Sequence, residues 1–496
     1  MAKRKILTFD YGATSGRAIL GEYENGKLTC TEIHRFENNP VEVTGHLYWD
    51  ILRLFHECKQ GLIKAAIAGH RDIEAVGIDT WGVDFALLDE NGMLLANPFA
   101  YRDVLTDGEL ERIAKEIPLR EIYDRTGIQL IKFNTLFQLT AIRAKFPELL
   151  ARTKKLVFIP DLLNYFLTGK LSSEFSIAST SSMLSAETRD WDRELLERLG
   201  IDPAILPPVT PSGQKLGRIL PNLAEETGVS CEVISVCGHD TGSAYLAVPK
   251  KADETCAFLS CGTWSLFGTE LPSPVVCEEG FGFNYSNEGG YGYTTRFLKN
   301  IMGLWIYGEI KREAERREGK LDYATLDKEL LAAPAFRSFI DPDAEDFMAP
   351  GRMAEKIRDY CRRTGQPVPE TRGELLRTAQ ESLALKYRYA VEGLEKILGR
   401  NFDTLRVVGG GCNDRILMCF TASALGREVI AGPVEATAIG NMAAQLLTLG
   451  ELRDVDEARA LVRASFEEKH YLPEDRAAWD EAYARFLPLV GRTAEL

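Results

Sequence analysis

Two segments of the chain show the same succession of apolar and polar positions. Residues 6–20 and 256–270 each contain an apolar run, a turn rich in Gly, Ser or Thr, and a second apolar run. Short apolar runs that are bounded by such turn residues are typical of buried strands. Each segment therefore predicts a hairpin of two strands, and the two hairpins stand at the heads of two halves of similar size.

Longer segments carry apolar residues at intervals of three or four positions, which is the spacing of one helix face. These segments predict helices at residues 47–69, 136–150, 160–169, 297–318 and 373–399. Residues 74–92 predict two strands around the turn at Trp81, and residues 405–426 and 428–450 each predict a strand, a turn and a helix. Strands that alternate with helices predict an α/β fold in which helices pack on mixed sheets.

The length of the chain and one polar segment predict two domains. At 496 residues the chain is too long for one compact core. Residues 248–255, VPKKADET, are polar, contain a proline and separate two apolar blocks, as a domain boundary does. We therefore predict one domain over residues 1–249 and a second over residues 250–496.

The composition argues against several classes of partner. The chain is 45% hydrophobic and 27% charged, which is ordinary for a globular enzyme, and its formal net charge is −14. Since no basic stripe is visible, we expect no nucleic-acid partner. Since no run of about 18 apolar residues occurs, we expect no membrane span. The ten cysteines are dispersed without a CxxC pair, which favours a reduced, cytoplasmic protein.

The turn of the first hairpin, DYGATSGR at residues 10–17, has groups that suit a bound phosphate. Asp10 leaves a strand and can hold Mg²⁺ through water, while Arg17 adds positive charge. The N–H groups of residues 12–16 can surround phosphate oxygens, because small residues allow a close approach. A glycine turn without a ligand is the commoner explanation of such a segment taken alone. The segment matches neither the P-loop pattern nor GxGxxG, so a nucleotide site here belongs to another architecture.

Two further turns extend this pattern into the second half. In SCGTWS, residues 260–265, Thr263 stands where a hydroxyl would meet a phosphate. GGGCN, residues 409–413, follows a predicted strand and precedes a predicted helix, where an anion can bind the helix N-terminus. A tight turn accounts for one glycine, but three in succession favour a ligand site that includes Gly410 and Gly411.

The segment GHDTGSA at residues 238–244 places an acid after a strand, among Gly, Thr and Ser. A helix N-cap is one explanation of Asp240. The alternative is that Asp240 accepts the proton of a hydroxyl as that hydroxyl attacks the γ-phosphorus of a nucleotide. His239 suits substrate orientation better than metal binding, because no second His or Cys stands at ligand spacing.

The turn after the strand at residues 74–80 provides candidates for a sugar pocket. Trp81 offers an apolar face that can stack on a sugar, and Gly82 allows a close backbone approach. Asp84 follows them, and Asn300 in LKNIMGLW is a further candidate. Core packing is the competing explanation of Trp81, and it is only somewhat less expected.

Several strings occur along the chain in one order: IDTWGVDFALLD, YRD, GIQ, FNTL, PDLLNYFLTG, GHDTGSA, SCGTWSL, LKNIMGLW, VVGGGCN and AGPVEATAIGN. In these strings the chain resembles the FGGY carbohydrate kinase family over essentially its whole length. The resemblance implies an α/β fold of two actin-like domains of the RNase H type, with ATP and a sugar in the central cleft. IDTWGVDF, KNIMGLW and AGPVEA imply in particular a kinase that converts L-rhamnulose and ATP into L-rhamnulose 1-phosphate and ADP, in the breakdown of L-rhamnose.

The resemblance also implies roles for the matching positions, with Asp240 as the proton acceptor. The first phosphate loop matches at Ala13, Thr14, Ser15, Gly16 and Arg17. The sugar site matches at Gly82, His239, Asp240, Thr241 and Asn300. The second ATP-phosphate contact matches at Thr263, and the adenosine site at the glycines around Gly410. The expected substrates are ATP, together with Mg²⁺, and a small-molecule ketose.

The chain departs from the family pattern mainly on the adenosine side. Similar enzymes can offer a Gln to ATP where this chain has Gly308, and Asn413 and Asp414 replace the usual Gln and Asn after GGGC. The family's YRDxRT appears as YRDVLT, with Leu105 in place of an Arg. These departures leave the implied chemistry intact.

Two other functions remain open at this point. The first is a kinase for another ketose, such as L-fuculose or xylulose, because only one or two hydrogen bonds in the sugar pocket separate these activities. The second is an actin-like or chaperone-like ATP-driven binding protein. In each case we expect a monomer or a small homo-oligomer.

Overall fold

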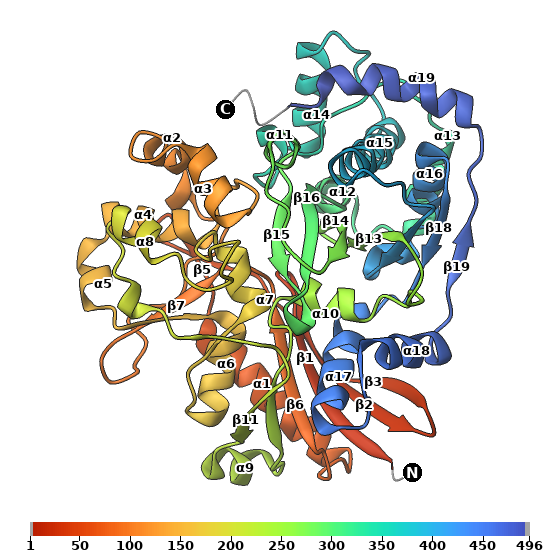
Figure 1. Cartoon of the computed structure of the whole chain (residues 1–496). Helices are drawn as coiled ribbons and strands as arrows, with labels where there is room; N and C mark the ends of the chain where they lie inside the picture. The colour runs from red at the N-terminus through yellow and green to blue at the C-terminus, as the bar shows by residue number, and fades with distance from the viewer. Residues whose placement is uncertain (1–2, 492–496) are drawn as a thin grey trace.

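The computed structural model describes residues 3–491 and contains two large sheets. Figure 1 shows the N-terminal part of the chain, red to yellow, beside the C-terminal part, green to blue. The first sheet has the order β11-β12-β6-β1-β2-β3. Its strands are β1 (Arg4–Tyr11), β2 (Ser15–Glu24), β3 (Lys27–Glu37), β6 (Ala75–Thr80), β11 (Gln214–Arg218) and β12 (Glu232–Ser235).

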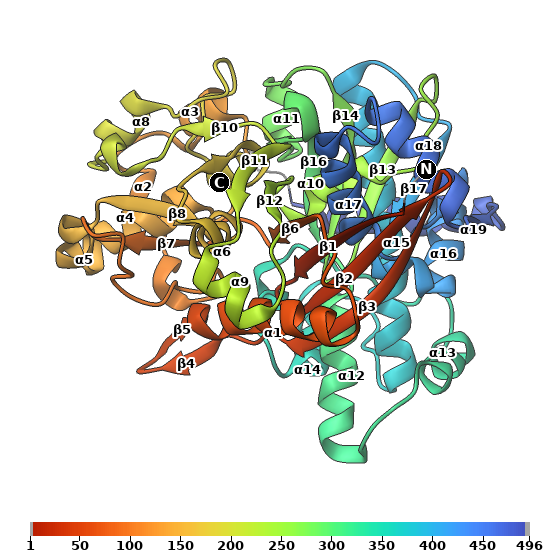
Figure 2. The ribbon, with the colours of Figure 1, turned by 90° about the horizontal axis from the view of Figure 1, so that it is seen from below.

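Both faces of the first sheet are covered, because alternate side chains of a strand point to opposite faces. Leu7 and Phe9 of β1 belong to the apolar cluster that includes helix α1 (Ile51–Ile67), whereas Ile6 belongs to the cluster that includes helix α17 (Ala436–Leu449). In Figure 2, α1 crosses one side of β1, β2 and β3, and α17 lies on the other side. A helix from the end of the chain thus completes the core of the first sheet.

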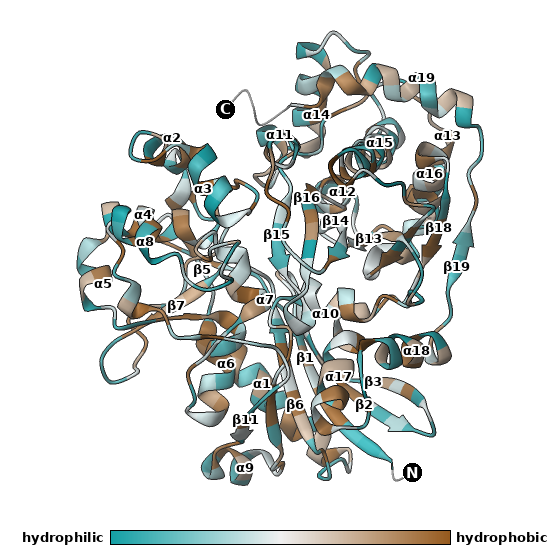
Figure 3. Cartoon of the chain, viewed as in Figure 1, coloured by the Kyte–Doolittle hydropathy of each residue, from teal (hydrophilic) through white to brown (hydrophobic). Residues whose placement is uncertain are grey.

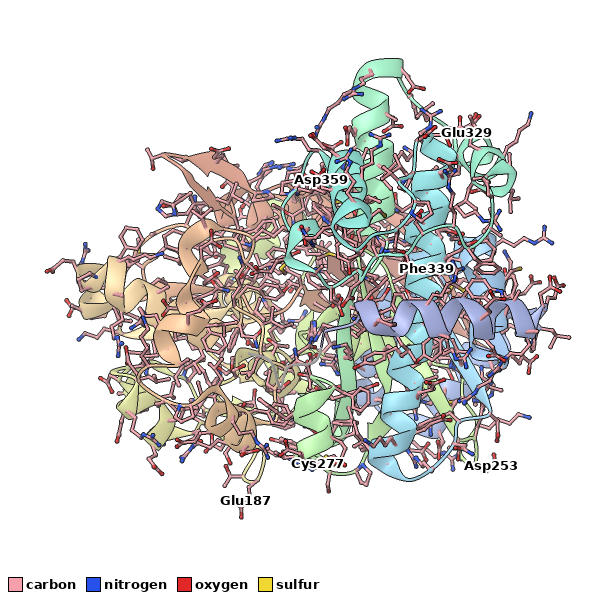
Figure 4. The ribbon with its side chains drawn as sticks, turned by 90° about the horizontal axis from the view of Figure 1, so that it is seen from above. Glu187, Asp253, Cys277, Glu329, Phe339 and Asp359 are labelled. Carbon is pink, nitrogen blue, oxygen red and sulfur yellow. The ribbon has the colours of Figure 1, made fainter. Side chains whose placement is uncertain are left out.

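The second sheet has the order β15-β16-β14-β13-β17-β18-β19. Its strands are β13 (Cys256–Cys261), β14 (Trp264–Leu271), β15 (Ser286–Gly289), β16 (Thr295–Met302), β17 (Thr404–Val408), β18 (Glu428–Ala431) and β19 (Lys469–Tyr471). The long helix α15 (Arg372–Leu398) begins at a capping box of Thr371 and Glu374 and packs against this sheet. Phe339, labelled in Figure 4, is buried and contacts Phe486 at a centroid distance of 6.4 Å.

The two sheets repeat one topology. In the first, β1, β2 and β3 form an antiparallel meander, and β6 and β12 follow in parallel beside β1. In the second, β13, β14 and β16 form the meander, and β17 and β18 run parallel to β13. This repeat confirms the predicted pair of similar α/β halves, and it brings the β1–β2 and β13–β14 turns to equivalent positions.

The remaining elements surround the sheets, and Figure 3 shows apolar residues along the strands of both. In the first half they are β4 (Val41–Val43), β5 (His46–Tyr48), β7 (Phe85–Leu88), β8 (Lys155–Phe158), β9 (Ser173–Glu174), β10 (Val209–Thr210), α2 (Glu109–Ile113), α3 (Leu119–Thr126), α4 (Thr135–Lys145), α5 (Pro147–Arg152), α6 (Ile159–Thr168), α7 (Phe175–Ala178), α8 (Arg193–Arg198), α9 (Pro221–Thr227) and α10 (Asp240–Leu246). In the second half they are α11 (Glu278–Gly282), α12 (Trp305–Glu318), α13 (Tyr323–Ala332), α14 (Met353–Arg363), α16 (Arg415–Leu425), α18 (Val455–Ser465) and α19 (Arg476–Phe486). Across residues 3–491, no helix combines the length and the apolar character that crossing a bilayer requires.

Two of the predicted helices are wrong in part. The predicted helix at residues 297–318 is strand β16 followed by helix α12, and they are separated at Gly303. An added Cβ at Gly303 would lie 2.6 Å from Ser265 Oγ, so the chain turns there against β14. The tertiary pairing of β16 with β14 and β15 outweighs the helical spacing of its apolar residues. The predicted helix at residues 136–150 is broken into α4 and α5, because Pro147 cannot continue a helix.

Candidate active site between the two sheets

A cleft with a volume of about 400 Å³ lies between the two halves. The tips of both hairpins, the turn after β6, the start of α10 and the glycine turn after β17 line it. The lining includes most of the predicted site residues, namely Asp10, Ala13, Thr14, Ser15, Arg17, Trp81, Gly82, His239, Asp240, Thr241, Thr263, Asn300 and Gly410. The fold thus brings together positions that are up to 400 residues apart: Asp10 and Gly410.

Two predicted residues lie behind the lining. An added Cβ at Gly16 would lie 2.1 Å from the ring of Phe36, and an added Cβ at Gly411 would lie 2.2 Å from Cys261 Sγ. Real Cβ atoms do not approach so closely, so each glycine lets its chain pack against the neighbouring strand. Their positions indicate a packing role that supports the two turns.

Asp10 stands at the end of β1, directly across the hairpin from Arg17. Arg17 Nη2 lies 2.7 Å from Asp10 Oδ2, and Arg17 Nη1 donates to Glu435. Burial raises the pKa of Asp10 to about 6 against the opposing effect of Arg17, and the charges of Asp240 and Glu435 raise it further. One arginine therefore pairs with two acids beside the turn of the first hairpin.

A second buried acid lies beside Asp10 on the neighbouring strand. Asp79 of β6 is opposite Asp10 in the parallel register, and Asn441 of α17 donates to its Oδ2 at 2.5 Å. Burial and the charge of Asp10 hold the pKa of Asp79 well above its usual range. Asp79 Oδ1 is buried without a hydrogen-bond partner among the described residues. This concentration of carboxylates suits a nearby cation.

The donor set at Asp10 fits Mg²⁺ held through water. In the described part of the chain no group of three His, Cys, Asp or Glu side chains is placed to hold a metal ion. Mg²⁺ does not need such a group, since it is usually held by one or two carboxylates, several waters and the phosphates of a substrate. The crowded acids around Asp10 are the kind of site that such an ion neutralises.

Asp240 is the first residue of α10, and His239 is the N-cap. Asp240 is therefore not the N-cap that it could have been by sequence alone. Its Oδ1 accepts from the Thr241 backbone N–H at 2.5 Å and from Thr241 Oγ1 at 3.0 Å, and its side chain is 27% exposed. The N-terminus of a helix favours a negative charge, and the Asp240 side chain lines the cleft.

His239 lies between Asp240 and a buried charged pair from the second half. Its Nε2 is 3.4 Å from Asp240 Oδ1, and its Nδ1 is 3.0 Å from Arg296 Nη2 and 3.3 Å from Glu288 Oε2. Although burial favours the neutral acid, the adjacent His239 and the charge of Arg296 lower the pKa of Glu288 to about 2. The first half thus contacts the second through this histidine.

Asp84 organises the wall that carries Trp81. Its Oδ2 accepts from Trp49 Nε1 at 2.6 Å, Trp81 Nε1 at 2.9 Å and the Tyr101 backbone N–H at 3.1 Å, and its Oδ1 accepts from Gln138 Nε2 at 2.9 Å. Burial raises the pKa of Asp84 to about 6, although these donors oppose the shift. Trp81 and Trp49 lie 4.2 Å apart between ring centroids. Trp81 is therefore packed in the core, and it also lines the cleft.

Asn300 is held by side chains from both halves. Gln129 Oε1 accepts from the Asn300 backbone N–H at 2.8 Å and from Asn300 Nδ2 at 3.1 Å. Asn300 Nδ2 also donates to Glu288 Oε1 at 3.2 Å. Gln129 and Glu288 line the cleft together with Asn300, so one polar cluster extends across the interface.

Sequence reasoning missed several residues of this site. It assigned no role to Gln129, Glu288, Arg296, Trp49 or Glu435. Gln129 lies in the GIQ string, which was a signal for the family but not for a contact. Glu288 and Arg296 lie on adjacent strands with no motif of their own, and only the pairing of β15 with β16 makes them neighbours.

The second hairpin presents neutral groups to the cleft. The Thr263 carbonyl accepts from the Gly303 backbone N–H at 3.1 Å, and the Trp264 carbonyl accepts from Gly262 at 2.8 Å. These bonds fix the turn against the start of α12. Ser265 Oγ and Tyr387 hydroxyl lie 2.5 Å apart beneath it.

The glycine turn after β17 is open on its cleft side. An added Cβ at Gly410 would meet no atom within 4 Å, whereas Gly308 faces Arg312 at 3.4 Å. Asp414 caps α16 by accepting from the Leu417 backbone N–H at 2.9 Å, and burial raises its pKa to about 6. Gly410, and not Gly308, therefore belongs to the cleft wall.

Comparisons with known proteins agree with this architecture. Residues 5–247 match the N-terminal domain, and residues 257–449 the C-terminal domain, of the FGGY family of carbohydrate kinases. The chain is 44% identical to a rhamnulokinase of Bacteroides thetaiotaomicron, over 98% of this chain and 99% of that protein. It is 41% identical to a rhamnulokinase of Halalkalibacterium halodurans, over 95% of this chain and 99% of that protein.

Solved structures agree in fold. A gluconate kinase of Lactobacillus acidophilus superposes with a TM-score of 0.81 at 16% identity, over 98% of each chain. A xylulose kinase from the same organism gives a TM-score of 0.81 at 17% identity, over 98% of this chain and 97% of that one. The repeated sheets, the central cleft and the two matched family domains lead to one conclusion: the chain belongs to the FGGY family of carbohydrate kinases.

Proposed function

We propose that the chain transfers the γ-phosphoryl group of ATP to O1 of L-rhamnulose, giving L-rhamnulose 1-phosphate and ADP, in the breakdown of L-rhamnose. Similarity to rhamnulokinases at 44% and 41% identity over nearly the whole chain supports this substrate. The observation that carries the chemistry is the position of Asp240, at the start of α10 and on the cleft between the two hairpins.

Asp240 accepts the proton of the attacking hydroxyl. As the sugar oxygen forms its bond to the γ-phosphorus, the bond from that phosphorus to the bridging oxygen breaks, and ADP leaves with the electron pair. A carboxylate within reach of the hydroxyl then takes the released proton. The sugar pocket around this carboxylate is formed by Trp81, Gly82, His239, Thr241 and Asn300.

The two hairpins hold the phosphates. The backbone N–H groups of residues 13–16 and the guanidinium of Arg17 contact the phosphates from the first half, and the Thr263 hydroxyl contacts them from the second. The turn that contains Gly410 and Gly411 forms the adenosine site, where Gly410 has an open face and Gly411 packs behind the turn. Asp10 would hold Mg²⁺ through water, and the ion would supply positive charge to neutralise the phosphates. The acidic chain acts in the cytoplasm, as a monomer or a small homo-oligomer.

A panel of ketoses tests the choice of substrate. ADP release is measured with L-rhamnulose, L-fuculose and D-xylulose at saturating MgATP, and L-rhamnulose is expected to give the highest kcat/KM. A buried hydrogen-bonding pocket can reject an analogue with one misplaced hydroxyl by several orders of magnitude. A higher kcat/KM for L-fuculose or D-xylulose would assign the sugar differently within the same family.

A further inference from the structure

Arg296 is fully buried and reaches the sugar side of the cleft through His239. It lies on β16, is 0% exposed, and donates from Nε to the Gly289 carbonyl at 2.7 Å. Its Nη2 lies 3.0 Å from His239 Nδ1, and its Nη1 lies 3.3 Å from Glu288 Oε2. Because an arginine is always protonated and has no acceptor, every polar contact of this side chain must be a donated bond.

This property determines which ring nitrogen of His239 carries the proton. If Nδ1 carried it, two N–H groups would face each other across the 3.0 Å contact with Arg296. Nδ1 lies closer to Arg296 Nη2, at 3.0 Å, than to Glu288 Oε2, at 3.3 Å, and Glu288 Oε2 is also the counter-ion of Arg296 Nη1 at 3.3 Å. The alternative in which both ring nitrogens are protonated has the same conflict. We infer that Arg296 holds His239 as the neutral Nε2–H tautomer, and that Arg296 and Glu288 are positioning residues for this histidine.

The tautomer gives the cleft a hydrogen-bond donor at a fixed place. His239 Nε2 lies 3.4 Å from Asp240 Oδ1, and an added Cβ at Gly82 would lie 3.2 Å from it. An Nε2–H at this point donates to the Asp240 carboxylate or to a sugar oxygen, and it cannot take a proton from the sugar. His239 therefore orients the ketose and leaves proton acceptance to Asp240. This role of His239 in the reaction rests on the proposed function, whereas its tautomer does not.

Glu288 balances the charge of Arg296 and fixes the neighbouring amide. Its Oε2 is the counter-ion of Arg296, and its Oε1 accepts from Asn300 Nδ2 at 3.2 Å. A buried arginine without a carboxylate partner is strongly destabilising. Glu288 thus stabilises the buried charge of Arg296 next to His239. Through its hydrogen bond from Asn300, it also joins Arg296 and His239 to the part of the pocket that Asn300 lines.

Nitrogen NMR of the protein labelled with ¹⁵N-histidine tests the tautomer without any substrate. Six histidines are present, and the His239→Gln variant identifies the signals of His239. We expect a pyrrole-like shift for Nε2 and a pyridine-like shift for Nδ1 at neutral pH. A pyrrole-like Nδ1 in the wild-type protein overturns the inference, whatever the ketose panel shows.

Two variants then test the cause. In Arg296→Met, Glu288 becomes the polar neighbour of Nδ1, so the ring proton is expected to move to Nδ1. In the double variant Arg296→Met, Glu288→Gln, the amide can donate to Nδ1, and the Nε2–H tautomer is expected to return. Retention of Nε2–H in Arg296→Met shows that Arg296 does not set the tautomer.

Activity measurements separate positioning from folding. Arg296→Met is expected to lower kcat/KM for L-rhamnulose about 10- to 100-fold, as for a lost hydrogen bond to a charged group, with the KM for ATP unchanged. The matched control is Arg406→Met. Arg406 lies on β17 and is also buried, and its Nε donates to the carboxylate of Glu254 at 2.6 Å. The control is expected to lose stability but to keep the His239 signals. If Arg296→Met does not fold, the wild-type spectrum decides the question, since a pyrrole-like Nδ1 in the wild-type protein overturns the inference.

Discussion

The two hairpins at the cleft occupy equivalent positions in their sheets but carry different groups. Near the tip of β1 and β2, Asp10 pairs with Arg17 in the antiparallel register. At the corresponding place in β13 and β14, one pair before the tip, the paired residues are Ser260 and Leu266. The two hairpins therefore share one backbone arrangement, but only the first carries a pair of charged side chains near its tip. Both turns can offer N–H groups to phosphates, but only the first can respond to charge that develops during transfer.

The ionisation of the two turns differs in the same way. Burial raises the pKa of Asp10 to about 6, which is near the working range of an enzyme. Burial also raises the pKa of the Cys261 thiol, to about 12, so that group stays neutral. We therefore expect changes in the first hairpin to affect the chemical step, and changes in the second to affect nucleotide binding.

Removal of Arg17 is expected to have the largest effect of the changes to the hairpins. Arg17→Met leaves Asp10 and Glu435 without their shared cation and removes a charge from the phosphate site. We expect kcat/KM for ATP to fall about 10²- to 10³-fold, as when one preorganised donor is removed from an active site. Steady-state kinetics at saturating L-rhamnulose measure this change. A loss below threefold would show that the first hairpin does not act through its charge.

The pH dependence of kcat/KM is the second test of the difference between the two hairpins. The ordinary pKa of an Asp is 3.8 and the value in the folded protein is about 6, so Asp10 is protonated, and unable to pair as an anion, below about pH 6. We expect kcat/KM for ATP to fall about tenfold per pH unit below that value. Because the pKa of Asp10 is higher in the folded protein than in the unfolded chain, the folded protein binds this proton more tightly. We therefore expect the free energy of unfolding of the ligand-free protein to fall as the pH rises from about 4 to 6.

The matched control for this pH profile is Thr263→Val, which changes only the neutral hairpin. It is expected to keep the acidic limb, while Asp10→Asn is expected to lose it. A wild-type profile that is flat between about pH 5 and 7 would contradict the role given to Asp10.

Thr263→Val alone should have a moderate effect. It removes one neutral hydroxyl from the second hairpin and preserves the volume of the side chain. We expect the KM for ATP to rise about 3- to 10-fold with kcat nearly unchanged, since one neutral hydrogen bond contributes about 0.5–1.5 kcal/mol. Initial rates at varied ATP measure it, and a large fall in kcat would remove the distinction between the hairpins.

The smallest expected effect on activity comes from the packing behind the second hairpin. In Gly411→Ala the new Cβ would lie 2.2 Å from Cys261 Sγ, whereas in Gly410→Ala it meets no atom within 4 Å. We expect Gly411→Ala to lower the free energy of unfolding by about 1–3 kcal/mol, as overpacking does. Gly410→Ala should stay within about 0.5 kcal/mol of wild type. Denaturant unfolding compares the two, and equal stabilities would contradict the packing described for Gly411.

Local patterns predicted the parts of this fold that local chemistry determines. The two hairpins, helix α1 behind Asp50, and the strand, glycine turn and helix around Gly410 all agree with their sequence patterns. Strand β16 was predicted as a helix because its apolar spacing fits both periods, and only its pairing with β14 decides between them. The boundary between residues 249 and 250 stays a prediction, and the packing of α17 on the first sheet shows that the halves share a core.

The candidate site was predictable where its residues lie in turns and not where they lie on strands. Asp10 lies at the end of β1, and Asp240 and Thr263 follow β12 and β13, where glycines mark the turns. Arg296 and Glu288 lie within the paired strands β15 and β16, and their meeting with His239 depends on contacts between the two halves. A single sequence contains no signal for such a contact.

The central claim is that Asp240 accepts the proton between the two hairpins, and the Asp240→Asn variant tests it most directly. ADP release that depends on L-rhamnulose and ATP binding are measured in parallel for the variant and the wild type. We predict that kcat falls by about 10²- to 10⁴-fold while ATP still binds, because the amide cannot take the proton but keeps the shape of the carboxylate. Undiminished sugar-dependent ADP release in the variant would contradict the account.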